Sequence, residues 1–279
     1  MLANGGDDAL RVFFDTFVEP YSAIVICEPT FPMYRYYAEI AGAKIVTLRY
    51  DENMQFPLAT ALAVLKKKPR VFFIANPNNP TGTLISSAAI RTILRAATDT
   101  AVVIDEAYSD FSGSTVARLI QKYPHLFVVR TFSKAAGLAA LRLGAVLAKA
   151  DSLALLRRAM PPFPVNLMAI VAAEAALKDR GAIRSYVAET LRVRKAFAEE
   201  LSKLGVRVFP GAGNFLLAYF GAHGPALFAE LGRRGILVRE RSKDIGAGFV
   251  RISIGTKSEM RQLLTVARKF VANTGKRFS

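Results

Sequence analysis

Short apolar runs alternate with helical segments over the first half of this 279-residue chain, and no other feature constrains its fold as strongly. The apolar runs have the length and composition of buried strands. They are residues 23–27, 43–48, 71–75, 101–104 and 126–130. The segments between them have helical character, at residues 31–41, 57–67 and 87–97. Strands that alternate with helices in this way predict an α/β domain with a mostly parallel sheet.

The pattern changes after about residue 150. Helices are predicted at residues 150–158 and 167–178, followed by a long one at 182–204. Short strands and helices then alternate in a smaller α+β domain, with a frayed tail from residue 273. The predicted strands are residues 206–209, 215–219, 236–238 and 249–254, and the predicted helices are 225–234 and 257–271. We therefore expect a large domain at 1–180 and a small one at 181–279.

The composition favours a cytoplasmic protein without a membrane partner. No apolar run approaches the roughly 18 residues of a membrane-spanning helix. The first residues, MLANGGDD, have neither the basic start nor the apolar stretch of a secretion signal. Cys27 is the single cysteine, so an internal disulfide is excluded. Its place in a predicted strand indicates a small buried apolar residue.

The net charge is +16, from 38 Lys and Arg against 22 Asp and Glu. Nucleic-acid binding is one interpretation, because basic surfaces attract phosphates. The basic residues are scattered, however, and the sequence has no zinc-finger cysteines, leucine heptad or RNA-binding aromatic motif. We expect no nucleic-acid partner and no bound metal. Attraction of anionic small molecules and ordinary solvated basic faces remain as explanations.

Polar motifs follow three of the predicted strands. They are Asn-Pro-Asn-Asn-Pro-Thr-Gly at 76–82, Asp-Glu-Ala-Tyr at 105–108 and Thr-Phe-Ser-Lys at 131–134. Each alone has an ordinary explanation, respectively a turn-rich loop, a helix cap and a surface lysine. Ligands of open α/β sheets bind beyond the carboxyl ends of the strands. Together the motifs therefore predict one site at that edge of the sheet.

This set of motifs, with Arg142 eight residues after Lys134, resembles the fold-type I, class I/II aminotransferases over essentially the whole chain. The resemblance implies the PLP-transferase fold type I, a sheet of the seven-stranded type and the cofactor pyridoxal phosphate. That cofactor needs a lysine for a Schiff base and a carboxylate that keeps its ring nitrogen protonated. By resemblance these are Lys134 and Asp105. Asn79 and Tyr108 resemble the pair that binds the phenolic oxygen, and Lys134 then moves the substrate proton.

The resemblance also implies how the cofactor phosphate and ring are held. Backbone N–H groups at a helix N-terminus bind phosphate, and the family's Gly-Ser/Ala-Asp turn is matched here with glycine in its second position. The phosphate set implied by the resemblance comprises Gly5, Gly6, Asp7, Thr131, Ser133 and Arg142. Tyr34 matches the aromatic residue that stacks on the ring, although a buried core tyrosine is the alternative.

Residues 27–34, 105–108, 130–139 and 251–256 most resemble histidinol-phosphate aminotransferases. This implies amino transfer between histidinol phosphate and 2-oxoglutarate, with Asn79, Arg239 and Arg251 contacting the substrate. Two guanidinium groups suit a phosphate dianion, but they also suit a carboxylate. Aromatic amino-acid aminotransferases, threonine-phosphate decarboxylases and a non-catalytic module of the same fold therefore stay open.

The resemblance further implies a homodimer and a segment before the phosphate turn that reaches the partner subunit. Gly5 lies only four residues into the chain, and residues 1–3 have the character of a strand leading into the turn. We expect the chain as given to hold its cofactor poorly and to be inactive or nearly so, because a turn tethered on one side loses more entropy on binding.

Overall fold

The structure is a computed structural model that describes residues 1–274 and 278. It divides into two compact units, each described by itself below. The first comprises Met1–Asn79 and Thr83–Ile183, and the second Pro80–Gly82 and the chain from Arg184 onward. Of the predicted frayed tail, residues 275–277 and 279 lie outside the described residues, whereas residues 273 and 274 complete the last helix.

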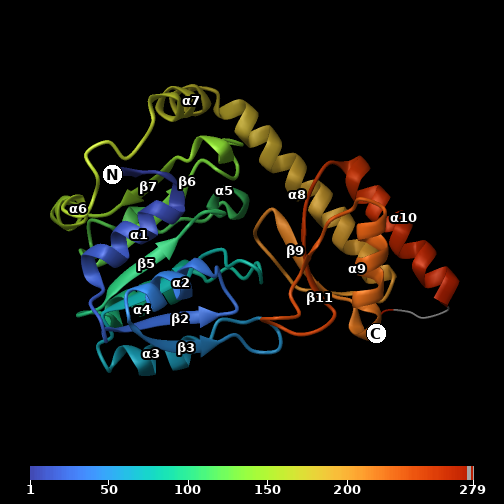
Figure 1. The fold of residues 1–279 in the computed structure, drawn as a ribbon, viewed down its shortest axis with the longest axis horizontal. Coiled ribbons are helices and arrows are strands. Elements are labelled where there is room, and N and C mark those ends of the chain that lie inside the picture. The colour runs from blue at the N-terminus through green and yellow to red at the C-terminus, as the bar shows by residue number, and fades with distance from the viewer. Residues whose placement is uncertain (275–277, 279) are drawn as a thin grey trace. The chain divides into compact units, whose positions relative to one another are not determined.

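The first unit is built on a seven-stranded sheet (Figure 1). The strands are β1 (Leu2–Ala3), β2 (Ala23–Glu28), β3 (Lys44–Arg49), β4 (Val71–Ala75), β5 (Ala101–Asp105), β6 (Leu126–Thr131) and β7 (Gly144–Leu147). Their order is β1-β7-β6-β5-β4-β2-β3. Only β7 pairs antiparallel with its neighbours, β6 and β1, while the pairs from β6 to β3 are parallel. The predicted mostly parallel sheet is therefore confirmed.

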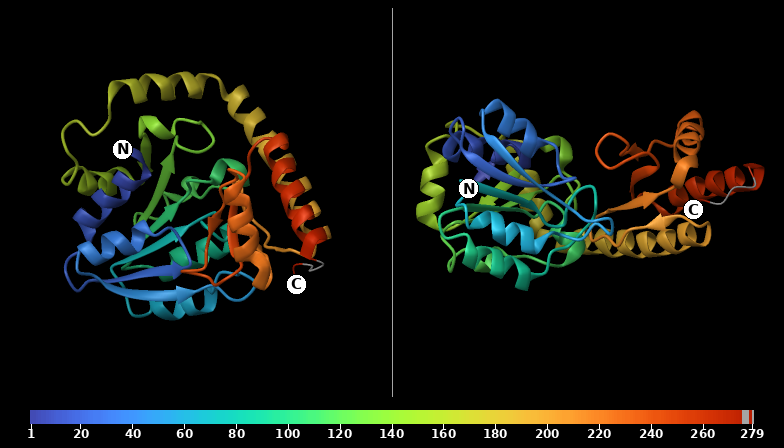
Figure 2. Two further views of the ribbon diagram at one scale, coloured as in Figure 1. Left: turned by 45° about the vertical axis from the view of Figure 1, so that its right-hand side comes forward. Right: turned by 90° about the horizontal axis from the view of Figure 1, so that it is seen from below.

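Helices cover both faces of this sheet (Figure 2). On one face lie α1 (Gly5–Phe17), α2 (Met33–Ile40) and α6 (Ala150–Arg157), and on the other lie α3 (Leu58–Leu65) and α4 (Ser87–Ala96). Side chains alternate between faces along a strand, so Phe73 packs in the first core and its neighbour Phe72 in the second. The short α5 (Ser109–Ser112), the 3₁₀ turns η1 (Ala117–Leu119) and η2 (Ala139–Leu141), and α7 (Leu167–Lys178) complete the unit.

The second unit is smaller and has an antiparallel sheet in the order β10-β11-β9-β8. The long helix α8 (Arg180–Lys203) begins in the first unit and continues from Arg184 in the second. The other elements of the second unit are β8 (Arg207–Val208), β9 (Phe215–Tyr219), η3 (Gly221–His223), α9 (Gly224–Arg233), β10 (Arg239–Glu240), β11 (Phe249–Ser253) and α10 (Lys257–Thr274). One apolar cluster joins α8, the sheet, α9 and α10, with Phe197, Leu216 and Leu263 among its buried members. The predicted smaller α+β arrangement is confirmed.

Two local predictions differ from the structure. The strand predicted at 236–238 is wrong, because the strand in this region is β10 at the next two residues. Leu237 is 87% exposed, so the apolar run has no buried face to hold it in a sheet. Strand β7 was not predicted, because glycine and alanine begin it and the run is too short for a clear alternation.

Among the described residues, no helix combines the length and the apolar character needed to cross a membrane.

Candidate functional site

The three polar motifs lie side by side at one edge of the first unit's sheet. They follow β4, β5 and β6, which are adjacent and parallel, so their carboxyl ends meet. Backbone bonds continue beyond the strands: the N–H group of Asn76 donates to the Asp105 carbonyl at 2.8 Å, and that of Glu106 donates to the Val129 carbonyl at 2.9 Å. These bonds fix the spacing of the loops that carry the candidate residues.

Asp105 ends β5 with its carboxylate already held by two donors. The Tyr34 hydroxyl donates to Oδ2 at 2.8 Å, and the backbone N–H group of Ala107 donates to Oδ1 at 3.0 Å. The residue keeps some exposed surface, yet its carboxyl group is surrounded closely by protein, and this desolvation raises its pKa. The two hydrogen bonds and the positive charge of Lys134 oppose the rise in pKa, while the charge of Asp7 adds to it. The site thus holds a buried acceptor suited to a cationic N–H group.

Lys134 lies just beyond β6, on a short turn. The N–H group of Ser133 donates to Thr131 Oγ1 at 3.1 Å, which curls the chain back after the strand. Lys134 is half-buried, and its Nζ is 5.4 Å from the centre of the Tyr108 ring. The structure therefore brings Lys134, Tyr108 and Asp105 to the same sheet edge, as the motifs predicted.

An anion cradle, formed by the first turn of α1 (Gly5, Gly6, Asp7) and the guanidinium of Arg142, lies in the same unit. The first N–H groups of a helix have no partner within the helix and carry partial positive charge. Gly5 has a φ of +87°, and a Cβ atom there would lie 2.7 Å from Arg142 Nη2, so the guanidinium lies directly against this turn. Arg142 also donates to Asp7 Oδ2 at 3.1 Å.

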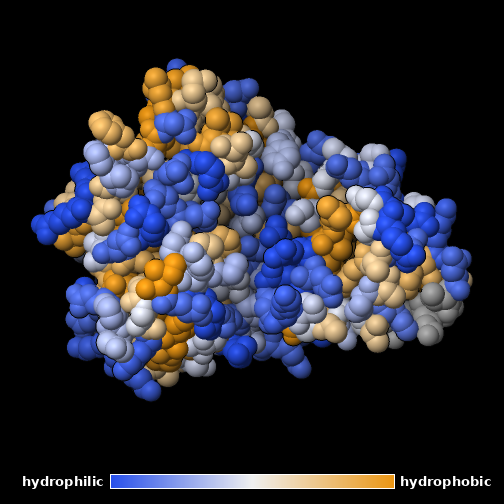
Figure 3. Space-filling view, in the orientation of Figure 1, coloured by the Kyte–Doolittle hydropathy of each residue, from blue (hydrophilic) through white to orange (hydrophobic). Residues whose placement is uncertain are grey.

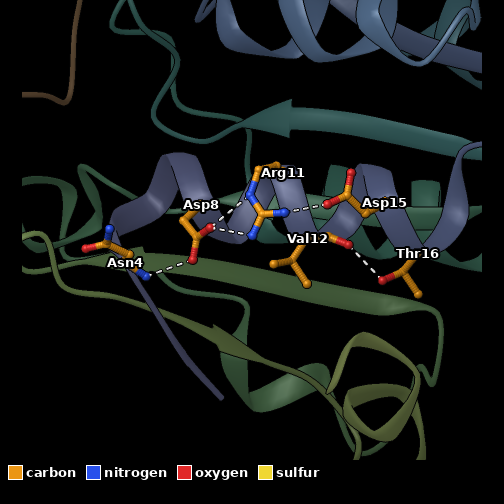
Figure 4. Close-up of polar contacts among 6 residues, drawn as sticks. All are labelled: Asn4, Asp8, Arg11, Val12, Asp15 and Thr16. Carbon is orange, nitrogen blue, oxygen red and sulfur yellow. Dashed lines mark hydrogen bonds and ion pairs between the residues drawn. The ribbon is translucent and has the colours of Figure 1, made fainter. Parts of the chain in front are cut away.

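The rest of the first turn of α1 is engaged locally (Figure 4). Asp8 accepts the N–H group of Asn4 at 3.0 Å and pairs with Arg11 at 2.8 Å, and Arg11 also reaches Asp15. Asp8 therefore closes the start of the helix. Asp7, in contrast, is the first-turn carboxylate that contacts the cradle's guanidinium.

Gly144 is a site residue that the motifs did not reveal. It begins β7, and a Cβ atom there would lie 2.5 Å from the carbonyl carbon of Gly5 and 2.8 Å from the nitrogen of Gly6. The backbone of the phosphate turn thus rests directly on the backbone of β7. A sequence signal exists, since Gly144 follows Arg142 by two residues, but its steric reason appears only when the turn and the strand are placed together.

The asparagines of the loop at 76–82 differ in burial and in their contacts. Asn76 exchanges two hydrogen bonds with the backbone of Ile85, at 2.8 and 3.2 Å. Asn78 accepts the Thr30 hydroxyl at 2.7 Å and donates to the Pro29 carbonyl at 2.9 Å. Both are buried, whereas Asn79 is only partly buried. Asn79 is therefore the side chain of this loop best placed to meet a ligand.

The expectation that Tyr34 stacks on a cofactor ring is wrong. The side chain is 0% exposed, its ring lies parallel to Phe73 at 5.5 Å, and Phe31 packs edge-on against it at 5.8 Å. Helix α2 begins at Met33 and turns Tyr34 into the core, which leaves no ring surface for a ligand. Phe31 precedes the helix, packs edge-on against Tyr34 and is itself only partly buried.

An ion pair with a buried carboxylate joins the loop after β5 to β6, and the sequence motifs do not reveal it. Glu106 Oε2 lies 2.8 Å from Arg130 Nη2, and the same carboxylate accepts the Thr115 hydroxyl at 2.8 Å and the N–H group of Val116 at 2.6 Å. Burial raises the Glu106 pKa, while these contacts oppose the rise. The pair holds the Asp-Glu-Ala-Tyr loop to the strand that leads to Lys134.

In the second unit, the two predicted substrate arginines lie opposite each other on neighbouring strands. Arg239 of β10 and Arg251 of β11 are opposite partners in an antiparallel pair, so their side chains emerge on the same face. The Arg251 guanidinium lies 4.3 Å from the centre of the Phe215 ring. Like charges in opposite positions destabilise a sheet, and an anion between them would remove this repulsion.

The residues at the sheet edge of the first unit fit pyridoxal phosphate. The cofactor has a phosphate group, a basic ring nitrogen and an aldehyde. The anion cradle matches the phosphate, since a Cβ atom at Gly5 would fill the space beside the guanidinium. The buried Asp105 carboxylate matches the ring nitrogen, and the amine of Lys134 matches the aldehyde.

The comparisons with known proteins agree with this chemistry. The family model of aminotransferase class I and II matches residues 1–266. Histidinol-phosphate aminotransferase 1 of Carboxydothermus hydrogenoformans is 35% identical over 266 residues, which cover 95% of this chain and 75% of the relative. Among solved structures, the histidinol-phosphate aminotransferase of Clostridium acetobutylicum has a TM-score of 0.91 at 27% identity, over 98% of this chain and 84% of the other. That of Sinorhizobium meliloti, in complex with pyridoxal-5'-phosphate, has a TM-score of 0.89 at 24% identity, over 96% and 76% of the two chains. The predicted fold, PLP-transferase fold type I, is confirmed.

Proposed function

Since this chain belongs to the aminotransferase class I and II family, a family of pyridoxal-phosphate enzymes, we propose that it exchanges the amino group of histidinol phosphate with 2-oxoglutarate. The aminotransferase and its cofactor, both predicted from the motifs, are confirmed by the family match. The observation that carries the proposed chemistry is the meeting of the Lys134 amine, the buried Asp105 carboxylate and the anion cradle in one unit.

When bound, pyridoxal phosphate supplies an aldehyde that links to amines and a ring that withdraws electrons from the substrate carbon. Lys134 Nζ would provide the amine that holds the cofactor aldehyde, and as a neutral amine it would serve as the base and acid that moves the substrate proton. Asp105 keeps the ring nitrogen protonated through its charge. Asn79 and Tyr108 bind the phenolic oxygen.

The chain's own donors hold the phosphate. Gly5, Gly6 and Asp7 offer backbone N–H groups at the start of α1, and Arg142 adds a guanidinium beside them. Thr131 and Ser133 complete the set of phosphate ligands from the turn before Lys134. The Asp7 carboxylate contacts Arg142 at 3.1 Å and keeps that side chain oriented toward the turn.

The opposed arginines of the second unit receive the anionic end of the substrate. Arg251 is oriented by its contact with Phe215, and Arg239 stands on the opposite strand. Two guanidinium groups on one face match a phosphate dianion better than one does, because each can form paired, charge-assisted hydrogen bonds. This favours histidinol phosphate, and the names of curated relatives such as that of C. hydrogenoformans agree.

A substrate comparison tests the proposal. The protein loaded with pyridoxal phosphate would be given histidinol phosphate, phenylalanine or O-phosphothreonine, each with 2-oxoglutarate. We expect glutamate to form with histidinol phosphate far faster than with the other two. Glutamate from phenylalanine alone would instead show an aromatic aminotransferase, and release of carbon dioxide from O-phosphothreonine would show a decarboxylase. No product from any substrate would contradict the proposed activity of this chain, and it would agree with a non-catalytic module or with the low activity expected for the chain as given.

We also propose that the protein acts as a homodimer in the cytoplasm, with residues 1–180 as its cofactor domain and 181–279 as its small domain. Support for the dimer comes from α7, where large apolar side chains are exposed and apolar surface gathers (Figure 3). Those side chains are Leu167, Met168, Val171 and Leu177. Sedimentation of the protein and of Met168→Glu would test this, with a monomeric wild type contradicting it. Cell fractionation would test the location, and limited proteolysis near residue 180 the domain division.

A further inference from the structure

We propose that Tyr34 is a positioning residue: its buried hydroxyl holds Asp105 as an ionised, oriented acceptor for the ring nitrogen of the cofactor. The inference rests on the proposed function, because it concerns the hydrogen bond from the cofactor's ring nitrogen to Asp105. It replaces the stacking role expected from the sequence with a role that acts through another residue.

The geometry directs both available donors at the charged form of Asp105. The Tyr34 hydroxyl reaches Oδ2 at 2.8 Å, and the N–H group of Ala107 reaches Oδ1 at 3.0 Å. Hydrogen bonds that donate to a carboxylate favour its ionised form over the neutral acid. A carboxylate oxygen accepts more than one bond, so one donor on each oxygen fixes the plane of the group and leaves lone pairs for a third donor, the ring nitrogen.

The surrounding charges explain why this bond matters. Burial raises the pKa of Asp105, and the charge of Asp7 raises it further, while Lys134 lowers it. Burial and the neighbouring Asp105 also raise the pKa of Tyr34 well above its usual value, with smaller contributions in the same direction from Tyr50 and Tyr108. Tyr34 therefore remains a protonated donor across the working pH range. Asp105, by contrast, depends on its donors to stay ionised.

Packing makes the contact rigid and irreplaceable by water. The Tyr34 ring is parallel to Phe73, with an interplanar angle of 17°, and meets Phe31 at 83°. The residue has no exposed surface, so solvent cannot supply a substitute donor if the hydroxyl is removed. A loss of this hydroxyl would then raise the proton affinity of Asp105 and weaken its hold on a protonated ring nitrogen.

Tyr34→Phe tests the inference, because it removes the hydroxyl and keeps the packed ring. The matched control is Tyr37→Phe on the same helix. Tyr37 packs against Phe14, and within the described residues its hydroxyl makes no hydrogen bond. We expect Tyr34→Phe to raise the dissociation constant of pyridoxal phosphate by roughly tenfold to a hundredfold, the effect of losing one bond to a charged group. Tyr37→Phe should stay within about twofold of wild type.

The second readout is the pH titration of the bound cofactor's visible absorption. With less positive charge on the ring nitrogen, the nitrogen that links the cofactor to Lys134 becomes more basic. The midpoint should therefore move to higher pH in Tyr34→Phe, by about one unit for a tenfold change in proton affinity, and should not move in Tyr37→Phe. In an Asp105→Asn background, Tyr34→Phe should produce little further change in either readout, because the residue acts through Asp105.

Each result decides the matter. An unshifted midpoint with unchanged cofactor affinity would overturn the role of Tyr34, and so would an undiminished effect in the Asp105→Asn background, which would indicate packing alone. A wild-type protein that takes up no cofactor would overturn the proposed function and this inference together. Uptake by the wild type with no difference between the two tyrosine variants would overturn this inference only.

Discussion

Replacing Gly144 by alanine should displace the phosphate turn. The added Cβ atom would lie 2.5 Å from the carbonyl carbon of Gly5, 2.6 Å from its oxygen and 2.8 Å from the nitrogen of Gly6. Carbon atoms pack favourably at about 3.5–4.0 Å, so the turn must move by about 1 Å. All three contacts are with backbone, which cannot rotate away as a side chain can. We expect a loss of about 1–3 kcal/mol in the free energy of unfolding.

The displacement should also weaken the binding of the cofactor, because the N–H groups of Gly5 and Gly6 would no longer point at its phosphate. A misplacement of about 1 Å can reduce activity roughly a hundredfold. The matched control is Gly232→Ala in α9, where a Cβ atom would meet nothing within 4 Å. There, alanine should leave the stability unchanged or raise it by about 0.5–1 kcal/mol.

Urea unfolding of the cofactor-free proteins and titration with pyridoxal phosphate would measure both effects. Gly144→Ala should unfold at lower urea and bind the cofactor more weakly, while Gly232→Ala should match the wild type in cofactor affinity. If the two variants were equally stable and bound the cofactor equally well, the phosphate turn would not rest on β7 as described.

Two further variants probe the charges of the two units. Burial raises the pKa of Asp105 in the folded protein above its ordinary value of 3.8. The protonated carboxyl group therefore contributes fully to stability below pH 3.8, and this contribution is lost as the pH rises through the folded pKa. The cofactor-free Asp105→Asn variant should therefore gain stability relative to wild type as the pH rises above 3.8. Urea melts at a series of pH values would measure this, and a stability difference that stays constant with pH would contradict the raised pKa of Asp105. Arg251→Ala should weaken the binding of histidinol phosphate by roughly 2–5 kcal/mol if the bound contact is buried. The control Arg207→Ala removes a guanidinium that is stacked on Phe209, two strands away in the sheet, and should leave the binding of histidinol phosphate unchanged. Equal affinities for the substrate in the two variants would remove Arg251 from the anion site.

The sequence was informative where chemistry follows local pattern. Alternating strands and helices predict the parallel sheet, and the end of each strand predicts where Asp105 and Lys134 lie, because parallel strands share one carboxyl edge. The spacing of the motifs also predicts that Arg142 lies near the phosphate turn, and the contact of Arg142 with Asp7 agrees with this.

The sequence did not predict features that depend on contacts between distant parts of the chain. Whether Tyr34 faces a ligand or the core depends on where α2 begins and on the presence of Phe73 beneath it. Gly144 is required by the backbone of a segment more than a hundred residues earlier in the chain. The pairing of Glu106 with Arg130 joins the loop after β5 to the neighbouring strand β6, 24 residues further along the chain. No local sequence pattern predicts these contacts between residues that are far apart in the chain.

The covalent position of the cofactor tests the proposed chemistry most directly. Protein loaded with pyridoxal phosphate would be reduced with borohydride, digested and analysed by mass spectrometry, beside Lys134→Ala and the control Lys149→Ala. We expect the visible band to disappear on reduction and the cofactor mass to be found on the peptide that contains Lys134, in the wild type and in Lys149→Ala. Lys134→Ala should carry no fixed cofactor and should form no glutamate, while keeping its fold. Cofactor fixed at another lysine, or turnover by Lys134→Ala within about tenfold of wild type, would contradict the assignment of Lys134.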